Sequence, residues 1–409
     1  MRKMNARVGW LAVLLAVSAL GAPAAEIKLA APENGATLEL LTPIEKEFLA
    51  NADKRGVCPP EPQSALDEFQ KKVEEYKKRV AAGEKKAKTP RDGYNFYEHN
   101  DYTGPLMKRR KEEVYRPLKW QITGNLTALK VVCSETADFA RAVELPLGYN
   151  EKAKSWPDGA LPVCLRLDTK YFWKVVAKDE NGSEVVSETR NFVTSGQLPR
   201  IMRTPLFNNC RDLGGGKNAA GKKIRQGLVY RSTAPCTGIN EAQIRRGIAL
   251  MEGLKSELDL RSRNECQKRV QEWKEAQPET CGINHMYHEI IPYHMHYPNN
   301  LPSFRKIFEV LADKQNYPLT FHCAVGADRT GTIGFLIGAV LGRTDEQLVD
   351  DYEFTAFQDS TPRYRYCRKA RELFSFLKTP YRDNVEGYLQ QIGVAKEHID
   401  ALRANMIEE

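Results

Sequence analysis

Short runs of apolar, aromatic and β-branched residues recur through the first half of the chain. The clearest are 118–122, 128–133, 171–177 and 189–194. Such runs are typical of β-strands when turn residues separate them, as at 179–182. The pattern predicts a β-sandwich over residues 26–198.

One segment inside this region has a different pattern. Residues 64–88 are strongly charged, and their apolar residues recur with helical spacing. Those that share one face are Phe69, Val73, Tyr76 and Val80. The segment is predicted to be a helical insertion, either a surface helix or a helix that binds a partner.

The second half of the chain alternates between strand and helix patterns. A glycine and a proline at 195–199 mark a linker. Beyond it, the apolar run 318–321 reads as a buried strand and 332–341 as a buried helix. We therefore predict a multidomain protein in which an α/β domain over 199–409 follows the sandwich.

The N-terminus has the pattern of a secretory signal. Basic residues precede the apolar run 8–20, and small residues at 22–24 offer a cleavage site. We expect residues 1–25 to be a signal peptide and the protein to be periplasmic or secreted; an uncleaved anchor is the alternative. No later run is long and apolar enough to cross a membrane.

The charge balance says little about partners. The chain of 409 residues has a net charge of +8, and its basic residues are dispersed. No basic block is interleaved with aromatic residues, so nucleic acid is not an expected partner. A weak attraction for anionic substrates is all that the charge implies.

The run from His322 to Gly331 carries the clearest chemistry. It places Cys323 and Arg329 six positions apart, with a glycine between them, where the predicted strand gives way to the helix. Loop N–H groups and a helix N-terminus favour an anion there, and a guanidinium can grip two phosphate oxygens. The same field lowers the pKa of a thiol, and the Thr330 hydroxyl can stabilise the thiolate.

This loop resembles the His-Cys-x5-Arg-Thr/Ser-Gly signature of cysteine-dependent protein tyrosine phosphatases. The segments 209–215, 230–232, 259–262, 350–352 and 388–394 extend the resemblance. Together they are similar to the atypical bacterial and fungal members whose loop reads Cys-x2-Gly-Lys-Asp-Arg-Thr-Gly. The strands of the first half resemble a fibronectin type III-like sandwich.

The resemblance implies a division of roles. Cys323 is the expected nucleophile, Asp328 the acid, and Thr330 a stabiliser of the leaving thiolate. Arg329 holds the phosphoryl oxygens together with the loop, and the remaining substrate-binding positions are Ala324, Val325, Gly326, Ala327, Gly331, Arg211 and Asp212. Arg211 and Asp212 are expected beside the pocket, where they would order the loop.

The general acid has alternatives. Asp328 could instead be a salt-bridge partner, which leaves Glu289, His294 and His296 as candidates. The motif 156–159 spells the acid loop of other tyrosine phosphatases, but it lies far from Cys323 and is better interpreted as a turn.

The resemblance implies no cofactor. Metal binding by the histidines at 285, 288, 294 and 296 is a weaker alternative, because the phosphatase chemistry requires no metal.

The substrate is expected to be a phosphorylated protein or a small phosphomonoester, with phosphotyrosine first. Relatives carry a lysine where this chain has Ala327. A lysine there would point to the pocket mouth, so we expect this chain to prefer singly phosphorylated substrates. The alternatives are a phosphoinositide or inositol phosphate phosphatase, and a phosphate-binding pseudophosphatase that acts as an interaction module.

Nine cysteines leave at least one unpaired. Cys323 must be free if the enzyme is active. Cys133 with Cys164, and Cys266 with Cys281, are plausible disulfides in an exported protein.

Overall fold

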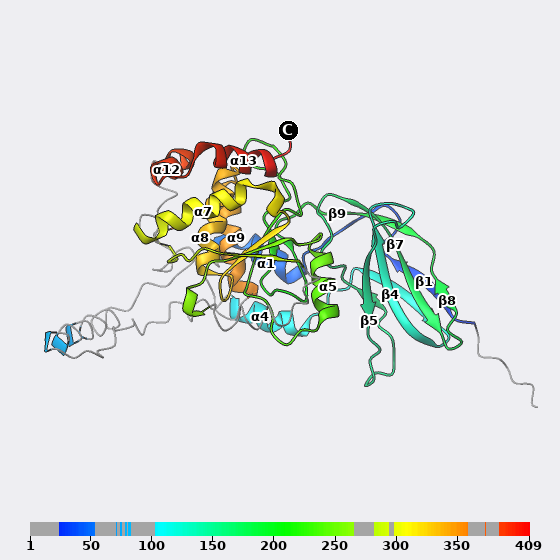
Figure 1. Cartoon of the computed structure of the whole chain (residues 1–409). Helices are drawn as coiled ribbons and strands as arrows, with labels where there is room; N and C mark the ends of the chain where they lie inside the picture. The colour runs from blue at the N-terminus through cyan, green and yellow to red at the C-terminus, as the bar shows by residue number, and fades with distance from the viewer. Residues whose placement is uncertain are drawn as a thin grey trace, which may run out of the picture.

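The structure is a computed structural model of the whole chain (Figure 1). It describes residues 24–53, 103–265, 282–293, 298–358 and 384–409, together with residue 373 and some positions within 71–82. The predicted signal peptide lies almost wholly outside the described residues. So does most of the predicted helix at 64–88.

The N-terminal region contains two β-sheets. Their strands are β1 (Glu26–Ala31), β2 (Ala36–Leu38), β3 (Leu118–Thr123), β4 (Leu126–Ser134), β5 (Val143–Leu147), β6 (Gly159–Ala160), β7 (Lys170–Asp179), β8 (Glu184–Val186) and β9 (Arg190–Thr194). One sheet has the order β1-β3-β6, and the other β2-β9-β7-β4-β5 with β8 paired to β7.

The two sheets share one apolar core. Trp120 of β3 and Trp173 of β7 come from opposite sheets, and both are buried in this core. Alternate residues of β7, including Tyr171 and Val175, are buried on the same side. This alternation is the reason for the strand pattern in the sequence, and the predicted β-rich region is present.

The second region is built on a mixed sheet. Its strands are β10 (Arg200–Ile201), β11 (Arg211–Asp212), β12 (Val229–Ser232), β13 (Ser256–Asp259), β14 (Asn284–Tyr287) and β15 (Leu319–His322). The order is β10-β11-β12-β15-β13-β14, and the last four are parallel. The carboxyl ends of these parallel strands therefore meet at one edge, where α/β proteins place their ligands.

Helices cover this sheet (Figure 1). They are α5 (Glu241–Leu250), α7 (Leu301–Ala312), α8 (Asp328–Val340), α9 (Asp345–Gln358), α12 (Val385–Gln391) and α13 (Lys396–Met406), with short 3-10 turns at Pro298–Asn300 and Lys314–Asn316. Helix α8 is buried from Thr330 to Val340, as its continuous apolar sequence predicts. It packs with α7 and α13 in the main core of the α/β domain.

Two N-terminal helices belong with the α/β domain rather than the sandwich. Helices α1 (Pro43–Ala50) and α4 (Thr103–Glu112) contribute Phe48 and Leu106 to a small core that includes Phe354 of α9. The rings of Phe48 and Phe354 pack edge to face, with their centroids 5.9 Å apart. The prediction that all of residues 26–198 form one sandwich domain is therefore wrong at these helices, because their apolar faces are buried against α9.

The predicted linker at 195–199 leads into a buried junction. Arg200 is only 2% exposed, and its guanidinium donates to the carbonyl oxygens of Cys164 at 2.8 Å and Leu165 at 2.9 Å. The same guanidinium pairs with Asp212 and Glu252 of the α/β domain, at 2.7 and 2.9 Å. One buried cation thus joins the two regions.

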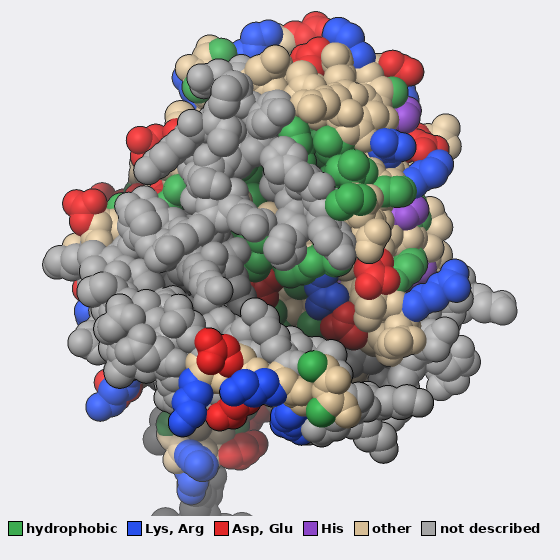
Figure 2. Space-filling model, turned by 90° about the vertical axis from the view of Figure 1, so that its left-hand side faces the viewer, with side chains coloured by type: hydrophobic (Ala, Val, Ile, Leu, Met, Phe, Trp, Pro, Cys, Tyr) green, Lys and Arg blue, Asp and Glu red, His purple; other side chains and the backbone are tan. Residues whose placement is uncertain are grey.

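Charged side chains of both signs are interspersed over the described part of one face, and hydrophobic side chains gather near its middle (Figure 2). In the described part of the chain, no helix is both long and apolar enough to cross a membrane.

Candidate active site

The loop 323–327 joins β15 to α8 at the carboxyl edge of the sheet. Its sharp turn depends on Gly326, whose φ is +69°. A Cβ at this position would lie 2.5 Å from the carbonyl oxygen of Ser232, so both the backbone angle and the space require glycine.

Two buried side chains fix the carbonyl groups of the loop. Asn209 Nδ2 donates to the oxygens of Val325 and Gly326, at 3.1 and 3.3 Å. Arg231 Nη2 donates to the same Gly326 oxygen at 2.9 Å. The N–H groups of residues 324–327 donate to no other group in the part of the chain that the structure describes. These amides are therefore available to an anion.

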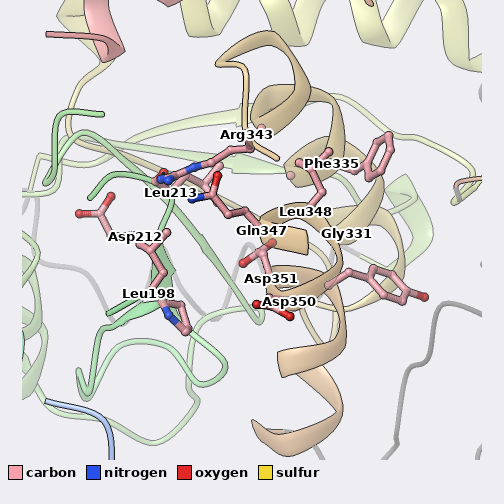
Figure 3. A pocket seen from close by; sticks show the side chains of 14 residues that line it. Leu198, Asp212, Leu213, Gly331, Phe335, Arg343, Gln347, Leu348, Asp350 and Asp351 are labelled. Atoms are coloured by element: carbon pink, nitrogen blue, oxygen red, sulfur yellow. The ribbon is translucent and has the colours of Figure 1, made fainter. Parts of the chain in front are cut away.

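Arg231 is held in turn by a buried ion-pair network. Asp351 accepts from Arg231 and from Arg211 Nε, the latter at 3.1 Å. Arg211 also donates to Asn209 Oδ1. It therefore contacts one of the two side chains that hold the loop and is linked to the other, Arg231, through Asp351. Figure 3 shows Asp351 among the side chains that line a pocket between α8, α9 and the segment at Leu198.

Arg211 and Asp212 do not reach the phosphate site. Arg211 is 0% exposed, and Asp212 accepts from Arg200 and from the amides of Gly214 and Gly227 at 2.7 Å each. The prediction that they bind substrate is wrong, because their buried charges are satisfied inside the protein. Arg211 acts on the loop only through Asn209 and Asp351.

Cys323 is nearly buried and lies next to the start of α8. Burial alone would raise the pKa of its thiol, but hydrogen bonds from the Thr330 hydroxyl and amide and the charge of Arg329 outweigh it. The pKa of Cys323 is therefore lowered, as the sequence predicts. The Thr330 hydroxyl is buried and makes no hydrogen bond to an oxygen or nitrogen in the described part of the chain.

Arg329 pairs with Glu265 through both guanidinium nitrogens, at 2.6 and 3.1 Å. This hydrogen bonding lowers the pKa of Glu265 to about 2. The carboxylate also accepts from the amide and hydroxyl of Ser262, at 3.0 and 2.9 Å. The pair uses two N–H groups of Arg329, and a guanidinium has five, so donors remain for phosphoryl oxygens.

A second ion-pair chain lies beneath Cys323. His322 Nε2 lies 2.5 Å from Glu257 Oε1, and His285 Nδ1 lies 2.8 Å from Glu257 Oε2. Burial alone would lower the pKa of His322, but Glu257 raises it overall. His322 Nδ1 also lies 3.2 Å from the Cys323 carbonyl oxygen, so the ring is fixed on both sides. Sequence analysis missed Glu257, whose only signal is a carboxylate inside a buried strand.

The candidate acid Asp328 is held by a tyrosine pair. Tyr293 donates its hydroxyl to Asp328 Oδ1, and the hydroxyls of Tyr293 and Tyr352 lie 3.0 Å apart. Tyr293 has a φ of +69° and is also tied by its amide to Thr332 at 3.0 Å. Sequence analysis missed Tyr293, because only the fold brings it to Asp328.

Two of the other acid and metal candidates have partners of their own among the described residues. Glu289 accepts from Tyr287 at 3.2 Å, and His285 belongs to the Glu257 pair. His294 and His296 lie outside the described residues. The motif 156–159 lies in the sandwich, where the exposed Asp158 pairs with Arg116 at 3.1 Å.

Two further expectations need correction. Ala327 is 0% exposed, so its side chain does not face the pocket mouth. Cys133 and Cys164 are both free and belong to different cores, one in the sandwich and one beside α5. The predicted disulfide between them is therefore wrong, and the Cys266–Cys281 pair lies outside the described residues.

Two curated proteins are similar in sequence to parts of this chain. A tyrosine-protein phosphatase of Nostoc commune is 26% identical over 132 residues, covering 26% of this chain and 44% of that protein. A putative tyrosine-protein phosphatase of Cupriavidus necator is 27% identical over 175 residues, covering 36% and 59%. This chain thus spans about half the length of the curated relatives it matches.

Two solved structures show some similarity to part of this chain. The catalytic core of the PP-IP phosphatase SIW14 from S. cerevisiae has 18% identity and a TM-score of 0.29, over 41% of this chain and 91% of that one. TpbA of P. aeruginosa has 13% identity and a TM-score of 0.28, over 41% and 86%. A family model described as the tyrosine phosphatase family matches residues 202–408, just over half of the chain. The chain belongs to the tyrosine phosphatase family.

Proposed function

We propose that this protein is a cysteine-dependent phosphatase that hydrolyses phosphate monoesters through a phosphoryl-cysteine intermediate. The observation that carries the proposal is the Cys323 thiol of lowered pKa, set in a loop of unpaired amides with Arg329 beside it. A thiolate at neutral pH needs no separate base.

The proposed reaction has two steps. The Cys323 sulfur attacks phosphorus, the bond from phosphorus to the ester oxygen breaks, and Asp328 gives that oxygen a proton. Water then attacks phosphorus and loses a proton to Asp328, while the sulfur leaves as a thiolate stabilised by Thr330. Arg329 and the loop amides hold the phosphoryl oxygens throughout.

Turnover of p-nitrophenyl phosphate in EDTA tests this proposal. We expect full activity in EDTA and inhibition by vanadate. No turnover by folded protein that still binds phosphate would instead indicate a pseudophosphatase, and activity lost in EDTA would indicate a metal-dependent enzyme.

The proposed acid can be tested by the leaving group. Asp328→Asn should slow an alkyl phosphate about 100-fold, in the range of general acid catalysis, and p-nitrophenyl phosphate far less, because its phenolate needs little protonation. Rates for both substrates give the answer. Equal slowing would show that Asp328 is structural, and Glu289→Gln would be measured next.

We propose phosphotyrosine as the substrate class, because both curated relatives are named tyrosine-protein phosphatases. Phosphoserine, a phosphoinositide and an inositol phosphate complete the panel that tests this choice. A higher kcat/KM for any of these three would reject it.

We also propose that the protein is exported and that its sandwich is of the fibronectin type III kind. The basic and apolar pattern of residues 1–25 supports export, and the three-stranded sheet facing a larger sheet supports the sandwich type. Expression with the native N-terminus should give an exported product without residues 1–25. An intact mass that retains them would refute the cleavage.

A further inference from the structure

A cleft opens where the N-terminal region meets the α/β domain. Its volume is about 510 Å³, within the roughly 300–1,000 Å³ of ligand-binding pockets. The walls come from α4, β5, the segment 201–210 and α5. We call it the junction cleft, and define it by Arg110, Leu145, Val163, Arg203, Arg246 and Leu250 among its lining residues.

The junction cleft is cationic. Arg110, Arg203 and Arg246 line it, and no Asp or Glu occurs among its described lining residues. The nearest carboxylate partner is the fully buried Glu45, which accepts from Arg203 at 2.9 Å and lies 3.8 Å from Arg110. Glu45 thus lies close to two of the three arginines.

The third arginine has no such partner. Arg246 makes no ion pair or side-chain hydrogen bond with the described residues, whereas its neighbour Arg245 pairs with Glu241 at 2.6 Å. Burial lowers the pKa of Arg110; Glu45 opposes this shift and Arg203 adds to it. An anion in the cleft would relieve this repulsion and would find Arg246 available.

The cleft adjoins the nucleophile loop. Asn209 lines it and holds the carbonyl groups of Val325 and Gly326. Phe207 also lines it, and its ring lies 6.4 Å from that of His322. Asn209 is therefore shared between the cleft and the nucleophile loop.

We propose that the junction cleft binds an acidic segment of a polypeptide substrate whose phosphorylated side chain occupies the loop. This rests on the proposed function and deepens it to phosphoproteins with acidic residues near the phosphorylated one. Apolar walls from Leu145, Val163 and Leu250 beside the arginines suit a chain that carries both apolar and acidic side chains. A concave cleft suits such a chain better than a flat membrane surface.

The test compares two phosphotyrosyl peptides on the full chain, one with Asp and Glu on both sides of the phosphotyrosine and one with Asn and Gln there. Wild type should show a higher kcat/KM for the acidic peptide, most strongly at low salt. Arg246→Gln should reduce this preference about tenfold, as expected for a lost charge-assisted contact. The matched control is Arg245→Gln on the same helix, which removes the same charge and should leave the preference unchanged.

Each result decides the matter. If Arg245→Gln and Arg246→Gln lose the preference for the acidic peptide equally, the preference depends on net charge alone and the proposal is overturned. An unchanged preference in Arg246→Gln would also overturn it. Binding to phosphatidylglycerol vesicles that depends on Arg246, without a preference between the peptides, would overturn it in favour of a lipid.

The junction cleft can be tested even if the protein is not an active phosphatase. If wild type does not hydrolyse p-nitrophenyl phosphate, fluorescence anisotropy of the two labelled peptides on the same variants replaces kcat/KM. Preferential binding of the acidic peptide, lost in Arg246→Gln, would still support the cleft. Equal binding of the two peptides would overturn it.

Discussion

Replacing Cys323 by serine should lower kcat for p-nitrophenyl phosphate by about four orders of magnitude or more, the scale of losing a nucleophile. The loop lowers the pKa of the Cys323 thiol and so favours the thiolate. A serine hydroxyl is far less acidic than a thiol and stays protonated at neutral pH. Steady-state rates on the purified variant give the measurement.

Binding provides the control for this variant. Serine is close to cysteine in size, and the loop amides and Arg329 are unchanged, so Cys323→Ser should still bind inorganic phosphate. Calorimetric titration of both proteins tests this. Turnover near the wild-type rate would exclude Cys323 as the nucleophile.

A chain that begins at Gln197 should be strongly destabilised. The truncation removes α1 and α4, whose Leu41, Ile44, Phe48 and Leu106 are buried in the core with Phe354. Each such side chain contributes roughly 1.5–3 kcal/mol when buried. The cut also removes the carbonyl partners of the buried Arg200. We expect aggregation or a loss of several kcal/mol in the free energy of unfolding.

Urea unfolding of full-length variants isolates the helical contact. Phe48→Ala should lower the free energy of unfolding by about 3–5 kcal/mol, as large-to-small changes in cores do. Tyr149→Ala is the control, because that ring lies in the N-terminal region and is 41% exposed. If the truncated chain has the same free energy of unfolding as the full-length protein, α1 and α4 do not stabilise the α/β domain as described.

Local pattern was enough to predict the nucleophile loop. Cys323, Gly326 and Arg329 lie within seven residues, and the structure has the strand before them and the helix after them that the sequence predicts. The lowered pKa of Cys323 has the same local origin, in Thr330 and the start of α8.

The supporting contacts could not be predicted, because they join distant segments. Tyr293 reaches Asp328 only after the sheet has formed. The family resemblance alone implies that Arg211 and Asp212 lie beside the pocket. The fold instead pairs Arg211 with Asp351, 140 residues later.

The predicted extent of the sandwich domain is wrong at α1 and α4 for a related reason. The strand pattern predicts a β-rich first half, and the structure contains it. The sequence of an amphipathic helix does not show which surface it packs against, however. The predicted range 26–198 therefore includes α1 and α4. Their buried faces complete the core around Phe354.

The most direct test of the account is to trap the intermediate. Wild-type protein is mixed with p-nitrophenyl phosphate in EDTA, denatured within milliseconds and mapped by mass spectrometry. We predict one phosphoryl group on the peptide that contains Cys323, and none in Cys323→Ser. A burst of p-nitrophenol without that modification, or a phosphoryl group on another side chain, would contradict the account.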